Sequence, residues 1–201
     1  SSSQSSSSSS SKSSSSSKSS SSSKRSSSSS SKRSSSSSSK TAIASGPRSA
    51  SIGASITGSA GGTIGWSGTN LIYAEGGGAA TFSSKPDRIS YFLRATGFGF
   101  TIPNGASITG IKAEIRKRSS VYGVGHDEQV LIVKDGLGEI VTQNKALAGN
   151  WGNNYPIDYS AYGGQYDLWG TTWTVAEINS SGFGVSISAH KPGSTLATLE
   201  V

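Results

Sequence analysis

The sequence contains no cysteine and no methionine among its 201 residues. The absence of cysteine excludes disulfide bonds and thiolate metal ligands. The sequence therefore does not indicate whether the protein works in an oxidising or a reducing compartment. Because residue 1 is serine, we expect the chain to be processed or to be a fragment of a longer gene product. No apolar run in this sequence approaches the length of a membrane span, and none has the pattern of a signal-peptide core.

Acidic residues are absent from the first fifty positions, which carry eight of the 18 Lys and Arg residues. The remainder of the chain has ten basic and eleven acidic residues and is close to neutral. The formal net charge of +7 therefore arises from the N-terminal segment. It does not make the rest of the chain a nucleic-acid binder.

Residues 1–40 contain 32 serines and no apolar side chain. Such a segment cannot bury a core, and its composition alone predicts a solvated, low-complexity tail. Its five lysines all occupy even positions, which would place them on one side of an extended chain. The basic residues of the segment are Lys12, Lys18, Lys24, Arg25, Lys32, Arg33 and Lys40.

Four interpretations of residues 1–40 are open. We favour an extended stalk, in which several chains pair their backbones and the small serines permit close approach. A flexible linker ranks second, and a glycosylated Ser-rich stalk ranks third. Nucleic-acid binding ranks last, because the segment has no aromatic residue for stacking and its lysines are six to eight residues apart.

Residues 41–61 form a Gly/Ser/Ala-rich transition. Ile52, Ala54 and Ile56 alternate with small polar residues, which is typical of a narrow strand, although a linker with chance alternation explains the pattern equally well.

From residue 62 onward, short apolar segments are separated by Gly, Asn, Pro and Asp. This pattern predicts an all-β domain over 62–201, an antiparallel β-sandwich of jelly-roll-like type. The clearest alternation is at 111–116, and residues 135–138 are expected to turn a hairpin. Only residues 175–179 look helical. The expected strands are 63–66, 71–74, 80–83, 89–95, 98–102, 111–116, 130–134, 139–142, 183–189 and 196–201.

Four stretches in combination resemble a known module: 95–111, 130–134, 162–170, and 173–179 running into 182–185. The chain from about residue 62 to 201 is similar to a β-sandwich of uncharacterised structural proteins of tailed bacteriophages. The resemblance implies a role in assembly or surface contact in a virion, without a known catalytic set. Val175 stands where such modules often carry proline, and the chain stops where the last strand is expected to continue.

Signals for catalysis are thin. The two histidines, His126 and His190, are far apart and lack ligand spacing, and His126-Asp127-Glu128 is expected in a solvent-exposed loop. We therefore predict no enzymatic activity, no catalytic residue, no cofactor and no metal. The basic run Arg116–Arg118 could contact an anionic partner, but a solvated strand end that discourages aggregation is favoured.

Aromatic residues gather between positions 151 and 173, in a segment otherwise rich in Gly, Asn and Asp. Such a segment is typical of long surface loops that make contacts. Its aromatic residues could pack in the core, form a subunit interface, or stack on a glycan. The candidate contact residues are Trp151, Tyr155, Tyr159, Tyr162, Tyr166 and Trp169.

The sequence thus predicts a non-enzymatic structural protein of a virion, a fibre or decoration subunit exposed on the particle surface. Its expected partners are copies of itself, most simply in a trimer, other virion proteins, and a cell-surface glycan. The alternative is a secreted bacterial adhesin or extracellular filament subunit with a Ser-rich stalk. A glycan-active enzyme would need a facing pair of carboxylates, and no such pair is evident.

Overall fold

A computed structural model describes residues 44–57, 62–72, 78–134, 142–153 and 159–201. The chain divides into two units, Ser1–Ala42 and Ile43–Val201. The predicted stalk with its basic residues, the predicted 135–138 hairpin and Tyr155 lie outside the described residues.

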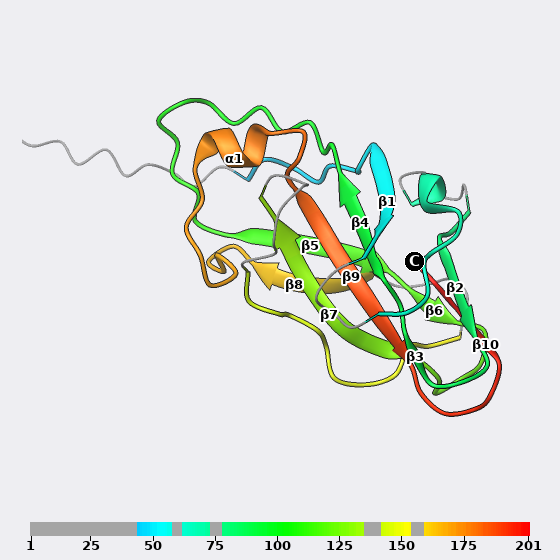
Figure 1. The fold of residues 1–201 in the computed structure, drawn as a ribbon. Helices are drawn as coiled ribbons and strands as arrows, with labels where there is room; N and C mark the ends of the chain where they lie inside the picture. Colours follow the sequence, from blue (N-terminus) through cyan, green and yellow to red (C-terminus); the bar gives the residue numbers. More distant parts are fainter. Residues whose placement is uncertain (1–43, 58–61, 73–77, 135–141, 154–158) are drawn as a thin grey trace, which may run out of the picture. The chain divides into compact units, whose positions relative to one another are not determined.

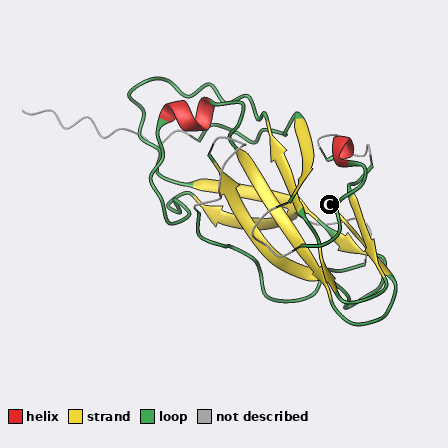
Figure 2. Ribbon diagram, viewed as in Figure 1, coloured by secondary structure: helices red, strands yellow, loops and turns green. Residues whose placement is uncertain are grey.

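The described unit is built from antiparallel strands (Figures 1 and 2). The largest sheet contains β1 (Ile52–Ile56), β3 (Arg88–Ile89), β4 (Phe92–Thr96), β7 (His126–Val133) and β9 (Gly184–Lys191). The second contains β2 (Thr81–Ser84), β6 (Arg118–Ser119) and β10 (Ala197–Glu200), and the third pairs β5 (Ile111–Arg116) with β8 (Tyr159–Gly164). The predicted all-β, antiparallel character is confirmed.

Strand β9 is the centre of the largest sheet. One of its edges pairs with β7, and the other pairs first with β4 and then with β3. Strand β1 continues the sheet beyond β4, with Ile52 opposite Thr96 and Ile56 opposite Phe92. The alternating residues around Ile52 therefore form a strand of the folded unit.

The three sheets contribute to one hydrophobic cluster. It contains Leu93 and Ile187 of the largest sheet, Phe82 of the second and Tyr162 of the third, with Trp169 fully buried among them. Burial of these large apolar side chains is expected to contribute strongly to the stability of the unit.

Helix α1 (Val175–Asn179) has the bounds predicted from the sequence. It begins with a capping box, in which the Thr174 hydroxyl accepts a hydrogen bond from the Glu177 amide and the Glu177 carboxylate accepts one from the Thr174 amide. Ile178 anchors the helix in the core. A short 3₁₀ turn, η1 (Thr69–Leu71), lies where a strand was expected to begin. Among the described residues, no helix has the length and apolar character needed to span a bilayer.

The predicted strand at 98–102 is wrong. Gly97 and Gly99 adopt positive φ angles of 72° and 64°, which interrupt an extended backbone. The alternating aromatic residues of this segment pack in the core instead. The rings of Phe98 and Phe100 meet that of Phe183 edge-on, with centroids 6.3 and 5.9 Å away. Their spacing reflects core packing by a loop.

The predicted strand at 89–95 is two strands in the structure. The chain leaves the edge of β9 after Ile89 and returns in β4. Between them, the Tyr91 amide donates to the carbonyl of Ile64, and the Ser90 hydroxyl accepts a hydrogen bond from the Ala189 amide. These competing partners explain the break.

Candidate functional site

Two histidines meet where β7 begins and β9 ends. In the antiparallel register His126 lies directly opposite His190. Nε2 of His126 is 3.1 Å from Nδ1 of His190, and the rings meet edge to face with centroids 4.7 Å apart at 71°. Pairing between strands far apart in sequence therefore brings together both histidines of the chain.

Two carboxylates flank this histidine pair. The register of β7 against β9 shifts between Asp127 and Gln129, so Glu128 is the extra residue of a β-bulge. A carboxylate oxygen of Glu128 lies 3.8 Å from Nδ1 of His190. On the other side, Asp87 lies 2.7 Å from Nε2 of His190. We call these four residues, His126, Glu128, His190 and Asp87, the histidine cluster.

Hydrogen bonding sets the protonation pattern of the cluster. Since the Asp87 carboxylate accepts a hydrogen bond, Nε2 of a neutral His190 carries the proton and Nδ1 presents a lone pair to His126. Burial, together with the neighbouring His190, holds the pKa of His126 below its usual value. The hydrogen bond from His190 likewise lowers the pKa of the Asp87 carboxyl. These shifts favour an uncharged His126 imidazole and an ionised Asp87 carboxylate.

A fully buried lysine fixes the loop that carries Asp87. The Lys191 ammonium donates hydrogen bonds to the backbone carbonyls of Lys85, at 2.7 Å, and Gly193, at 2.5 Å. The Gly193 amide in turn donates to the second oxygen of Asp87. The segment that precedes β3, from Lys85 to Asp87, is therefore tied to the end of β9, beside His190.

Asp127 points to the opposite side of β7, into the core. Its carboxylate accepts hydrogen bonds from the Lys117 ammonium (2.5 Å), the Trp151 indole (2.8 Å), the Tyr162 hydroxyl (2.9 Å) and the Leu147 amide (3.0 Å). Burial lowers the pKa of Lys117, and burial with the nearby Asp127 charge raises that of Tyr162. Every donor here has a partner within the protein, which is typical of a structural network.

Two predictions are therefore wrong. His126-Asp127-Glu128 is not a solvent-exposed loop, because β7 extends four residues further toward the N-terminus than its apolar residues indicate. Lys117 is not a solvated strand-end residue, because its side chain is buried against Asp127. Of its neighbours, Arg118 pairs with Glu200 of β10, and Arg116 lies over the ring of Tyr159.

The predicted aromatic contact residues separate into two groups. Trp151, Tyr162 and Trp169 are buried in the core, so their side chains are not on the surface. Trp169 has a positive φ of 58°, a conformation held by hydrogen bonds from its amide to Asp167 and from its indole to the carbonyl of Ile111. Their segment is also not a continuous loop, since β8 pairs with β5.

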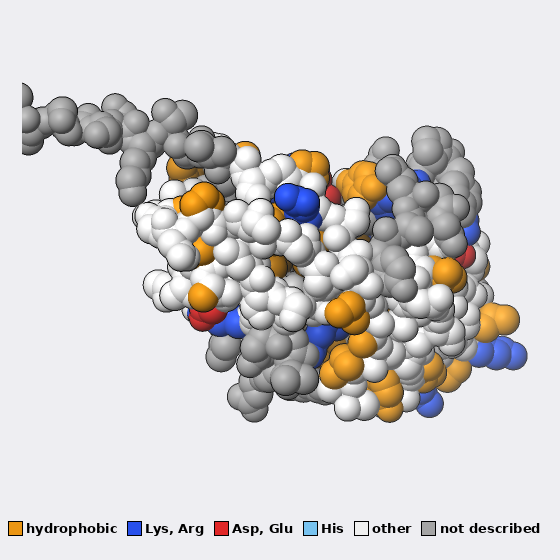
Figure 3. Space-filling model, turned by 90° about the horizontal axis from the view of Figure 1, so that it is seen from above, with side chains coloured by type: hydrophobic (Ala, Val, Ile, Leu, Met, Phe, Trp, Pro, Cys, Tyr) orange, Lys and Arg blue, Asp and Glu red, His pale blue; other side chains and the backbone are white. Residues whose placement is uncertain are grey.

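Of the members that the structure describes, Tyr159 and Tyr166 are exposed, at 53% and 79%. Tyr159 begins β8, and Tyr166 follows its end. On the face drawn in Figure 3, hydrophobic side chains form separate groups among backbone and other side chains, and charged side chains are sparse. Isolated tyrosines of this kind combine an apolar ring with a polar tip, which suits a wet contact surface.

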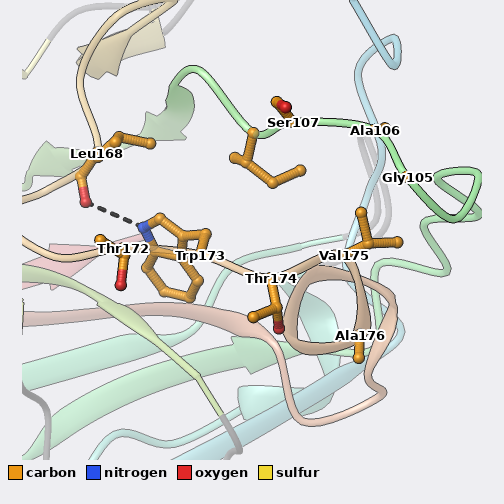
Figure 4. A pocket seen from close by; sticks show the side chains of 10 residues that line it. Gly105, Ala106, Ser107, Leu168, Thr172, Trp173, Thr174, Val175 and Ala176 are labelled. Carbon is orange, nitrogen blue, oxygen red and sulfur yellow. Dashed lines mark hydrogen bonds between the residues drawn. The ribbon is translucent and has the colours of Figure 1, made fainter.

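A pocket of about 590 Å³ lies between residues 105–108 and the segment 168–176 (Figure 4). Trp173 lies beside it, and its indole N–H donates a hydrogen bond to the carbonyl of Leu168. Val175, at the start of α1, also lines the pocket. None of its ten lining residues is acidic, basic or a histidine. The pocket therefore has no group of its own for acid–base chemistry.

Sequence reasoning missed the histidine cluster because its members come from three separate segments. One signal was present: His126 and Glu128 are two residues apart, as on one face of a strand. The comparisons with known proteins add nothing further, since no protein-family model matches the chain and neither curated proteins nor solved structures gave a significant match.

Proposed function

We propose that this chain is a non-enzymatic structural protein of a virion, a fibre or decoration subunit that acts by assembly and surface contact. In this proposal the sheets form a jelly-roll-like sandwich head, and residues 1–40 are a stalk that joins copies of the chain, most simply three. The resemblance of residues 62–201 to tailed-phage structural modules motivates the proposal, and the antiparallel all-β unit agrees with it.

The observation that carries the contact role is the placement of the aromatic residues. The tryptophans of the 151–173 segment are buried, whereas Tyr159 and Tyr166 remain exposed at opposite ends of β8. Tyrosine is enriched in protein interfaces and also stacks on sugars. We therefore assign contact with a neighbouring subunit or a cell-surface glycan to Tyr159 and Tyr166.

The assembly role is tested on the full chain by light scattering and electron microscopy. We expect a trimeric mass and an extended stalk. Replacing Lys12 and Lys24 by proline removes two backbone donors and should disorder the stalk and lower the mass. The matched control replaces the same lysines by alanine, which removes the same charges but keeps the backbone donors. A monomeric full chain, or equal effects of the two double variants, would contradict backbone pairing.

The contact role is tested by glycan-array and particle-binding measurements. Tyr166→Ala should lower binding at least tenfold, while Tyr122→Ala, at a comparable exposure of 77% on another loop, should not. Equal loss in both variants would argue against a specific tyrosine contact.

The alternative is a secreted bacterial adhesin or extracellular filament subunit. The Ser-rich composition of residues 1–40 favours it independently of the folded unit, because glycosylated stalks share this composition. The complete gene distinguishes the two: a signal peptide or wall anchor would support the adhesin, and neighbouring head and tail genes would support the virion protein.

A further inference from the structure

The histidine cluster has the donor set and the spacing of a transition-metal site. We propose that His126 Nε2, His190 Nδ1 and the Glu128 carboxylate bind one divalent ion of the zinc type. In this arrangement Asp87 does not touch the metal but holds His190 in position. The site is independent of the virion role and would serve equally in an adhesin.

The distances support a shared ion. One ligand atom from each of the three residues lies within 4.8 Å of the others. Two imidazole nitrogens bound to one zinc ion at about 2.0–2.1 Å lie about 3.3 Å apart at the tetrahedral angle. The observed separation of 3.1 Å between the two nitrogens is close to that value. The Glu128 carboxylate, 3.8 Å from Nδ1 of His190, must move inward to bind the same ion.

The surrounding contacts match those of a metal site. A metal-bound histidine usually donates its other ring N–H to a carboxylate, which orients the ring and fixes the tautomer. The hydrogen bond from His190 Nε2 to Asp87 has this geometry, and it leaves the lone pair on Nδ1, which faces Nε2 of His126 and would bind the ion in place of that contact. Asp87 is itself positioned by the Gly193 amide and by the Lys191 anchor of the adjoining loop. The carboxylate that would orient His190 as a ligand is therefore already in place.

The ligand types select the metal. Imidazole nitrogen favours Zn²⁺, Ni²⁺ and Cu²⁺, whereas Mg²⁺ and Ca²⁺ prefer sites made of oxygen atoms alone. The side chains of His190 and Glu128 are 24% and 31% exposed, so the cluster is open to solvent on one side. Three protein ligands leave a fourth tetrahedral position, which this open side can supply with water or with a group from a bound partner. An ion here would join β7 to β9 and, through Asp87, to the β2–β3 loop.

The amino-acid composition makes a metal-binding measurement easy to interpret. His126 and His190 are the only histidines of the chain, and cysteine is absent, so all imidazole coordination must arise at this cluster. The full chain without a histidine tag is titrated with Zn²⁺ by calorimetry and followed by ring-nitrogen NMR of the two histidines. We expect one ion per chain, simultaneous shifts of both ring signals, and no response to Mg²⁺.

Variants assign the ligands. His126→Gln and Glu128→Gln should each weaken Zn²⁺ binding at least tenfold, and Asp87→Asn should weaken it about 10–100-fold as a positioning residue. Glu114→Gln, which changes an exposed carboxylate of β5, is the matched control and should leave affinity unchanged. The proposal is overturned if the unmodified chain shows no saturable Zn²⁺ binding, if only one histidine responds, or if Glu128→Gln binds as the control does. The NMR titration needs no variant, so it decides the question even if a variant fails to fold.

Discussion

Lys117 and Asp127 form an ion pair inside the protein, with the ammonium nitrogen 2.5 Å from a carboxylate oxygen and the Asp127 side chain fully buried. Asp127 also accepts hydrogen bonds from Trp151, Tyr162 and the amide of Leu147. The two partners are therefore unequal. If the carboxylate is removed, four hydrogen-bond donors lose their acceptor. If the ammonium is removed, the carboxylate still accepts hydrogen bonds from three donors.

This inequality predicts different costs for the two substitutions. Asp127→Ala should lower the free energy of unfolding by about 3–5 kcal/mol, the range for breaking a buried pair. Lys117→Met, which keeps the length of the side chain, should cost distinctly less. Urea denaturation measures both, and Lys112→Met in the exposed pair with Glu114 is the control, expected to cost about 1 kcal/mol or less. A larger loss for Lys117→Met than for Asp127→Ala would contradict this account.

Lys191→Met tests the anchor beside the histidine cluster. The methionine fills a similar volume but leaves the carbonyls of Lys85 and Gly193 without their donor. We expect a loss of about 1–3 kcal/mol in unfolding free energy, because buried acceptors lose a partner. Faster amide hydrogen exchange should be confined to residues 85–88 and 192–194. Lys85→Met, on the exposed part of the same loop, is the matched control. Uniformly faster exchange would indicate that Lys191 does not act locally.

The separation of buried from exposed aromatic residues predicts a matching separation in stability. Trp169→Ala should cost about 3–5 kcal/mol, because it empties a fully buried site and removes the bond from the indole to Ile111. Tyr166→Ala should change stability by no more than about 0.5 kcal/mol, since that side chain is largely exposed. Thermal unfolding of the two variants and of the unmodified chain measures both losses. Comparable losses would show that Tyr166 is packed in the folded protein.

Local patterns in the sequence were enough to predict the elements whose signals are local. The strand Ile111–Arg116 was predicted with both ends because its inward and outward side chains alternate without interruption. Helix α1 was also predicted with both ends, and the structure shows that it begins with a capping box formed by Thr174 and Glu177. Both signals are contained within a few residues.

The candidate site was not predictable in this way. The apolar run at 130–133 indicated the end of β7, but the polar residues before it have a strand conformation only because β9 pairs with them. Asp127 is buried because Lys117, Trp151 and Tyr162 converge on it from other segments. His126 meets His190 only because of the register in which β7 pairs with β9, and the two residues are 64 positions apart in the sequence. Composition and periodicity do not specify that register.

The capping box of α1 predicts a pH dependence of stability. Hydrogen bonds from the Thr174 amide and then from Lys134 lower the pKa of the Glu177 carboxyl from its ordinary value of 4.5. A carboxyl whose pKa is lower in the folded state than in the unfolded state binds fewer protons when folded. Its stabilising effect is therefore complete above about pH 4.5 and is lost as the pH falls through the lower, folded-state pKa.

Glu177→Gln isolates this effect, because glutamine also fits the capping box but carries no charge. Near neutral pH the variant should be less stable than the unmodified chain by on the order of 1 kcal/mol, the value of a charge-assisted cap. Below the folded-state pKa of Glu177 the two unfolding free energies should converge, since the carboxyl is then neutral as well. Urea denaturation between about pH 7 and pH 3 measures the difference. If the gap between the two curves stays constant over that range, ionisation of Glu177 contributes nothing and the cap acts through its neutral hydrogen bonds alone.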